Sequence, residues 1–216
     1  LACTSCSDSW LDLNPSTSVP TDQAFTTLEN AQTALNGIYR LASAHSYYGD
    51  NFFYFGDCRA ADVQARMTKG DGRRVSPYYE YNVKATDSFN SSLPWNQVYK
   101  VIRQTNNLIA ATESGLIKTT DEAALNEIKA QALAMRGLAL YDLIRVFAMP
   151  YSYDNGQSLG VPIVTTATDQ SSKPARNTVA ECYDQIITDL TNSLAGLSKE
   201  KKDGCLNYWA VQGILS

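Results

Sequence analysis

Few residues of this 216-residue sequence have the types and spacing that catalysis needs. The only histidine is His45, so a Ser–His–Asp or Cys–His arrangement would have to be built around that one residue. We expect His45 to cap the end of the first helix instead. The sequence also lacks the HExxH, GxSxG and GxxxxGK[ST] motifs, which are the main signatures of zinc proteases, hydrolases and P-loop enzymes.

Two aspartates offer an alternative. Asp57 and Asp62 lie five residues apart and could form the acid pair of a glycosidase. Short carboxylates where a loop meets a helix more often cap backbone amides or pair with a cation, here Arg59. The glycine-rich stretch at residues 70–74 is too short to cradle a phosphate. We therefore predict that the protein is not an enzyme.

The five cysteines suggest neither a metal site nor a disulfide framework. They form no cluster with the spacing of tetrahedral zinc ligands, their number is odd, and a chain of this length does not need disulfide bonds. We expect Cys58, Cys182 and Cys205 to be small buried apolar residues. No metal and no cofactor is predicted.

The two cysteines near the start of the chain suggest a different role. Small residues precede both Cys3 and Cys6, as they do the cysteine that takes the lipid at the end of a bacterial lipoprotein signal. Cys6 leads directly into a polar run, so we prefer it as the lipidation site and keep Cys3 as the alternative. Residues 1–20 are then a lipoprotein tether, whose Ser, Asp and Pro favour an extended, solvated chain.

Charge and hydropathy exclude two classes of partner or environment. The net charge is -4, and the scattered basic residues form no stripe, so we predict no nucleic-acid binding. No run approaches the roughly 18 consecutive apolar residues that would cross a bilayer. The 13 tyrosines outnumber the six phenylalanines, which indicates rings whose rims meet water or a polar ligand.

Helical periodicity covers most of the chain, and capping boxes predict where two helices begin. Thr119 with Glu122 opens one long helix, and Thr178 with Glu181 opens the next. We expect a mainly all-α fold of tetratricopeptide-like helix pairs in one domain, residues 21–216, which ends within a helix and lacks later repeats. Periodicity is lost over residues 47–94, which predicts a functional loop region. The expected helices cover residues 28–43, 94–113, 121–147 and 178–197, with a further start near 207.

Six sequence blocks occur in order along the chain. They are CSDxxLD…P (residues 6–15), TxxAF and ALNGIY (21–39), GDxRAAD (56–62), WxxVYxxIxxxN (95–106), AxAMRGxAxYDLIRVF…PY (132–151) and GVPIV…RxTVAECYDQIIxDL (160–190). Each block alone is weakly specific, but the order of the six along essentially the whole chain resembles the SusD/RagB family.

This resemblance implies a surface-exposed, lipid-anchored protein of the outer membrane of Bacteroidetes. Such proteins are built on tetratricopeptide-like helix pairs, capture glycan and sit on a SusC-like TonB-dependent transporter; they bind nutrients and are not enzymes. The cysteine would be the membrane anchor. The resemblance covers about the N-terminal half of a typical member, so the C-terminal part of the fold would be missing. The alternative is a helical-repeat scaffold that recognises protein without binding sugar.

The aromatic residues of the loop region suit sugar capture. A sugar ring stacks its C–H face on a flat side chain, while its hydroxyl groups need polar donors and acceptors. The region before the WxxVY helix supplies both, and the resemblance carries ligand contacts over to it only as a region. Trp95 could equally pack in the core, as we expect of Arg136 and Tyr141. The candidate ligand-binding residues are Arg73, Arg74, Tyr78, Tyr79, Tyr81, Asn90 and Trp95.

Overall fold

The structure is a computed structural model that describes residues 25–59, 76–82, 94–166 and 172–216. Within these residues the chain folds into helices joined by loops, and β-pairing is limited to two isolated bridges. The fold class is therefore mainly all-α, as the sequence predicts. The helices are α2 (Leu28–Ala42), the π-helix η2 (His45–Gly49), α3 (Asn51–Asp57), α4 (Ser76–Tyr79), α5 (Trp95–Glu113), α6 (Glu122–Phe147), the 3-10 helix η4 (Tyr151–Tyr153), α7 (Val179–Ser193) and α8 (Tyr208–Leu215).

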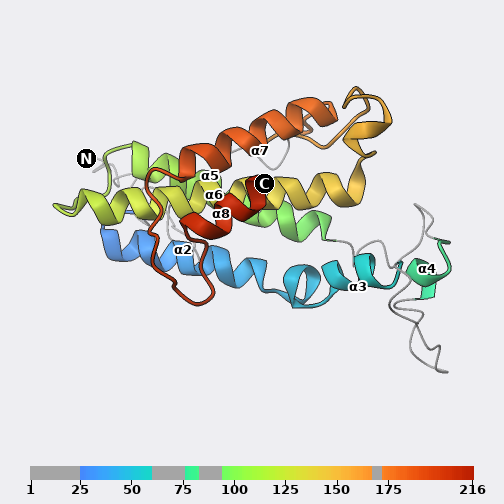
Figure 1. Ribbon diagram of the computed structural model, residues 1–216. Coiled ribbons are helices and arrows are strands. Elements are labelled where there is room, and N and C mark those ends of the chain that lie inside the picture. The colour runs from blue at the N-terminus through green and yellow to red at the C-terminus, as the bar shows by residue number, and fades with distance from the viewer. Residues whose placement is uncertain (1–24, 60–75, 83–93, 167–171) are drawn as a thin grey trace, which may run out of the picture.

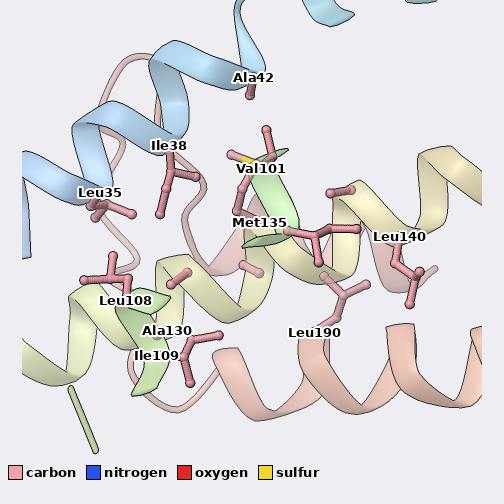
Figure 2. Packing of buried hydrophobic residues seen from close by; sticks show 14 of the residues in the cluster. Leu35, Ile38, Ala42, Val101, Leu108, Ile109, Ala130, Met135, Leu140 and Leu190 are labelled. Atoms are coloured by element: carbon pink, nitrogen blue, oxygen red, sulfur yellow. The ribbon is translucent and has the colours of Figure 1, made fainter. Parts of the chain in front are cut away.

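The long helix α6 lies at the centre of the bundle. It packs against α5 and α7 and, less extensively, α2, and successive long helices run in opposite directions (Figure 1). The sequence of α6 explains this position, because its alanines and apolar residues occur all round the helix. Side chains from four helices meet in one core, including Ile38, Val101, Met135 and Leu190 (Figure 2).

Small residues let α6 and α7 approach closely. A Cβ atom added at Gly137 would lie 3.0 Å from Cγ of Leu190. Beside this contact, the guanidinium of Arg136 donates to both carboxylate oxygens of Asp189, at 2.7 and 2.6 Å, and to Oδ1 of Asn106 at 2.9 Å. Arg136 is therefore a buried residue that ties α6 to α7 and α5, which confirms the expected helix-contact role.

The capping predictions had mixed outcomes. Thr178 and Glu181 form the predicted capping box at the start of α7. Thr119 does not cap α6; its hydroxyl accepts from the amide of Asp121, and the Asp121 carboxylate accepts from the amide of residue 124. Asp121 is the N-cap because an aspartate immediately before the first helical residue reaches the orphan amides of the first turn directly. Asn207 caps α8 as expected.

His45 does not cap the first helix. Helix α2 ends at Ala42 with Ser43 as its C-cap, and His45 instead begins η2, where its Nδ1 lies 2.8 Å from Oδ2 of Asp50. The predicted loop region is also more helical than expected, because α3 lies within it. The aromatic residues of α3 show no clear amphipathic period, so helical periodicity did not predict this helix.

The internal cysteines are free thiols. Cys58 and Cys182 are buried, as predicted, but Cys205 is only half-buried because it lies in the turn between α7 and α8. Cys3 and Cys6 lie outside the described residues, as does the tether predicted over residues 1–20.

Candidate functional site at the aromatic end of the bundle

The alternating helix directions bring four helix ends together at one end of the bundle. The end of α2, the start of α5, the end of α6 and the start of α7 lie there, next to η2, α3 and η4, on the right of Figure 1. Each of these segments contributes aromatic residues. We call this region the aromatic end, and we include in it α4 and the residues up to 82, which contact α3 and the residues after it through Tyr78 and Tyr81.

A buried carboxylate organises the aromatic end. Asp142, on the last turns of α6, is 1% exposed and accepts hydrogen bonds at Oδ2 from the hydroxyls of Tyr47, at 2.5 Å, and Tyr48. Its other oxygen accepts from the guanidinium of Arg145, one turn along. The carboxylate therefore fixes η2 against the end of α6, although 94 and 95 residues separate it from the two tyrosines along the chain.

The two tyrosines need their protons to make these bonds. Their rings stack at 4.1 Å with 18° between planes, although Tyr47 has non-helical backbone angles. Burial raises the pKa of the Tyr47 hydroxyl well above its ordinary value, and the negative charge of Asp142 raises it further. Burial is also the main cause of the raised pKa of Tyr48. Both hydroxyls are therefore held as donors over the whole neutral range.

Helix α3 extends this packing to the surface. Phe52 lies edge-on to Tyr47 and Tyr48, and Phe53 lies edge-on to Phe52. Phe53 is 48% exposed, so part of its ring faces solvent. The guanidinium of Arg145 lies 5.5 Å from the centre of the Phe52 ring, within the range of a cation–π contact.

The three candidate tyrosines near α4 have different environments. Tyr78 is 3% exposed and packs edge-on against Phe55, so its ring faces the protein in this structure. Tyr79 is partly exposed, and Tyr81 is 69% exposed. The Tyr81 hydroxyl donates to the carbonyl of Arg59, whose guanidinium lies over the rings of Phe55 and Tyr81 at 4.7 and 5.7 Å.

Trp95 is the candidate with a mixed position. It begins α5 and is half-buried, packed against Tyr99 at 5.0 Å and edge-on against Phe147 at 4.9 Å. The contact with the end of α6 matches the core packing that we weighed against ligand binding. Arg73, Arg74 and Asn90 lie outside the described residues, and their assignment stays a prediction.

The described residues offer little for catalysis or metal binding. Asp57 is exposed at the end of α3, and its suggested partner Asp62 lies outside the described part of the chain. Across residues 25–59, 76–82, 94–166 and 172–216, His, Cys, Asp and Glu side chains form no cluster that could hold a metal ion. Within the same ranges, no helix combines the length and apolar character needed to cross a membrane.

The aromatic end can therefore bind a ligand by stacking. Of its exposed rings, Phe53 packs edge-on against Phe52 and the Tyr81 hydroxyl is hydrogen-bonded to the Arg59 carbonyl, so these two have little side-chain freedom to lose on binding. Tyr79 is exposed as well. Tyr79 and Tyr81 are among the candidates from the sequence, and their ligand role stays a prediction; Phe53 was not among those candidates, nor were Asp142 and Arg145. The only signal for Asp142 and Arg145 was their place in the AxAMRGxAxYDLIRVF block.

Comparison with known proteins gives one consistent family. The family model described as "Starch-binding associating with outer membrane" matches residues 9–216. A SusD-like protein of Bacteroides ovatus is 26% identical over 211 residues, which cover 98% of this chain and 36% of the relative. SusD-like protein P2 of Formosa agariphila is 32% identical over 190 residues, which cover 86% of this chain and 34% of the relative.

Solved structures show the same fold. A SusD superfamily protein of Bacteroides thetaiotaomicron matches 88% of this chain and 41% of its own, with 64% identity and a TM-score of 0.83. One from Bacteroides vulgatus matches 88% and 42%, with 33% identity and a TM-score of 0.82. A laminarin-binding SusD-like protein shares the fold at 17% identity, with a TM-score of 0.71 over 88% of this chain and 39% of its own. This chain thus spans about two fifths of the length of these structures and about a third of the length of the two SusD-like relatives.

Proposed function

The chain belongs to the SusD-like family of starch-binding proteins associated with the outer membrane, and from this premise we propose that it captures oligosaccharide at the cell surface and delivers it to a SusC-like TonB-dependent transporter. The observation that carries the proposal is the aromatic end, where the exposed ring of Phe53 packs on a hydrogen-bonded base and Tyr79 and Tyr81 are exposed in and just after α4. A sugar ring would stack on Phe53, Tyr79 or Tyr81. Arg73, Arg74 and Asn90 remain the proposed polar partners of its hydroxyl groups.

Calorimetric titration with a panel of oligosaccharides tests the binding site. We expect the double variant Tyr79→Ala plus Tyr81→Ala to bind about fivefold or more weakly, because two stacking contacts are worth roughly 1–3 kcal/mol together. The matched control is Trp209→Ala, which removes an exposed ring of α8, remote from the aromatic end (Figure 1). Equal losses in the two variants, or no loss in the double variant, would contradict this site.

The proposed transporter contact uses the regular helices rather than the aromatic end. Packed helix pairs offer a rigid face of the size that a stable complex needs, roughly 1,200 Å² or more. We therefore expect the Tyr79→Ala plus Tyr81→Ala variant to co-purify with the transporter from detergent-solubilised outer membranes although its glycan binding is weakened. Loss of the transporter with unchanged glycan binding would reverse the assignment of the two surfaces and favour the scaffold alternative.

The anchor and the absence of catalysis are tested separately. Mass spectrometry of the native N-terminus should find a lipid on Cys6 or, as the alternative, on Cys3. An unmodified terminus upstream of both cysteines would exclude the anchor. The purified protein should release no reducing ends from polysaccharide, and release that disappears in an Asp57→Asn or Asp62→Asn variant would instead support a glycosidase.

A further inference from the structure

A separate groove lies within the aromatic end, on the side where α6 ends and α7 begins. It has a volume of about 360 Å³, near the lower end of the roughly 300–1,000 Å³ typical of small-molecule sites. None of the candidate residues derived from the sequence lines it. Its walls include Tyr141 and Arg145 of α6, Tyr151 of η4 and Tyr183 of α7.

The tyrosines of this groove form a continuous aromatic wall. Tyr183 lies edge-on to Tyr151 at 5.7 Å and to Tyr141 at 6.4 Å. Tyr151 is 47% exposed, so its ring is accessible as well as supported. The three hydroxyls make no hydrogen bond to other described residues and are therefore available to the hydroxyl groups of a ligand.

The loop after η4 fixes the Tyr151 ring. Gly156 has a positive φ of 77°, and a Cβ atom there would lie 2.7 Å from Cε2 of Tyr151. The Gly156 amide donates to the Tyr151 carbonyl at 3.0 Å, and the Gly156 carbonyl accepts from the amide of Ala180 at 2.9 Å. A glycine is thus required where the ring rests against the backbone, and the same residue ties the loop to α7.

Arg145 joins the groove to the first site. Its guanidinium lies 4.5 Å from the ring centre of Tyr141 in the groove and 5.5 Å from that of Phe52, which supports Phe53. One terminal nitrogen is bonded to Asp142, and the side chain is 46% exposed. The guanidinium has five N–H donors, so donors remain for a ligand that passes between the two places.

We propose that this groove is a second saccharide subsite, continuous with the surface of α3 through Arg145, and that the ligand is therefore an oligosaccharide long enough to occupy both. The class of ligand rests on the proposed function. The lining itself favours sugar over a peptide, because tyrosine rings with available hydroxyls and a charge-paired arginine match the C–H face and the hydroxyl rim of a pyranose.

Titration with a homologous series from disaccharide to hexasaccharide tests the proposal. For the wild type, affinity should show a second rise once the oligosaccharide is long enough to reach the groove. Tyr151→Ala should remove that second rise, so that its affinity for the longest member is at least tenfold lower than that of the wild type. Its affinity for the disaccharide should be unchanged. Gly156→Ala should act in the same direction by displacing the ring, and thermal unfolding checks that both variants are folded.

The matched control is Tyr153→Ala, which removes an exposed tyrosine of the same 3-10 helix that does not line the groove. It should bind every member of the series like the wild type.

Wild-type affinity that is independent of length beyond the disaccharide, or a Tyr151→Ala loss that is equal at all lengths, would overturn the second subsite and leave the first in place. A Tyr151→Ala variant that binds every glycan normally but no longer retains the transporter would make the groove a protein contact. No binding to any glycan would contradict both sites.

Discussion

Removing the Asp142 carboxylate should destabilise the protein and loosen the aromatic end together. In Asp142→Ala the buried Tyr47 hydroxyl loses its acceptor, which costs about 1–3 kcal/mol, and the half-buried Tyr48 hydroxyl adds roughly 1 kcal/mol. Arg145 contributes little, because its partly exposed guanidinium regains water. The sum is about 3 kcal/mol, or a fall in Tm of roughly 6–12 °C for a chain of this size.

Thermal and urea unfolding of three variants would measure this effect. Asp142→Asn keeps the shape and one acceptor oxygen, so it should lose only about half as much stability as Asp142→Ala. The control Asp184→Ala removes an exposed aspartate of α7 and should change stability by less than about 0.5 kcal/mol. If Asp142→Ala melted within 1 °C of the wild type, the carboxylate would not hold η2 in place, and the argument for a rigid base under Phe53 would fail.

Three further predictions concern the bundle and the tyrosine pair. Gly196→Ala should cost about 1–3 kcal/mol in urea unfolding, because its Cβ would lie 2.8 Å from a backbone carbonyl of α6; an unchanged midpoint would show that the contact relaxes. Arg136→Met should cost about 3–5 kcal/mol by leaving Asp189 buried and unpaired, and adding Asp189→Leu should restore much of that loss; no recovery would contradict the charge argument. The pKa of Tyr47 and that of Tyr48 are raised in the folded protein, so the stability they contribute is complete below about pH 10 and declines as the pH rises further; Tyr47→Phe should flatten this alkaline decline, and an unchanged profile would refute it.

The helices could be predicted because their signals are local. The apolar period and the caps lie within a few residues of each other, as at Thr178 and Glu181, and the bounds of α5 and the start of α7 follow from them. The expected end of the last of these helices, residue 197, was too late, because α7 ends at Ser193. The Thr119 cap was wrong because Thr119 and Asp121, two residues apart, could each serve as the cap and the sequence does not rank them. Helix α3 was not predicted, because its aromatic residues face both the interior and solvent.

The site was harder to predict because its contacts are distant in sequence. Spacing alone cannot indicate that Asp142 accepts from hydroxyls 94 and 95 residues away, or that Tyr78 turns its ring toward Phe55. Aromatic composition identifies a region that suits stacking, but it does not separate the rings that build the base from those that face solvent. That separation depends on burial, which arises only when η2, α3 and the end of α6 pack together.

Helix α6 connects stability to binding through two buried polar residues on different faces. Arg136 fixes α7 through Asp189, and Asp142, six residues later, fixes η2 through the tyrosine pair. Because residues six apart point to different sides of a helix, α6 sets the positions of both α7 and η2 at the aromatic end. Apolar packing alone would tolerate small shifts of α7 and η2, whereas these bonds require one register. Changes at Arg136 should therefore reach the groove between Tyr141 and Tyr183, although Arg136 does not line it.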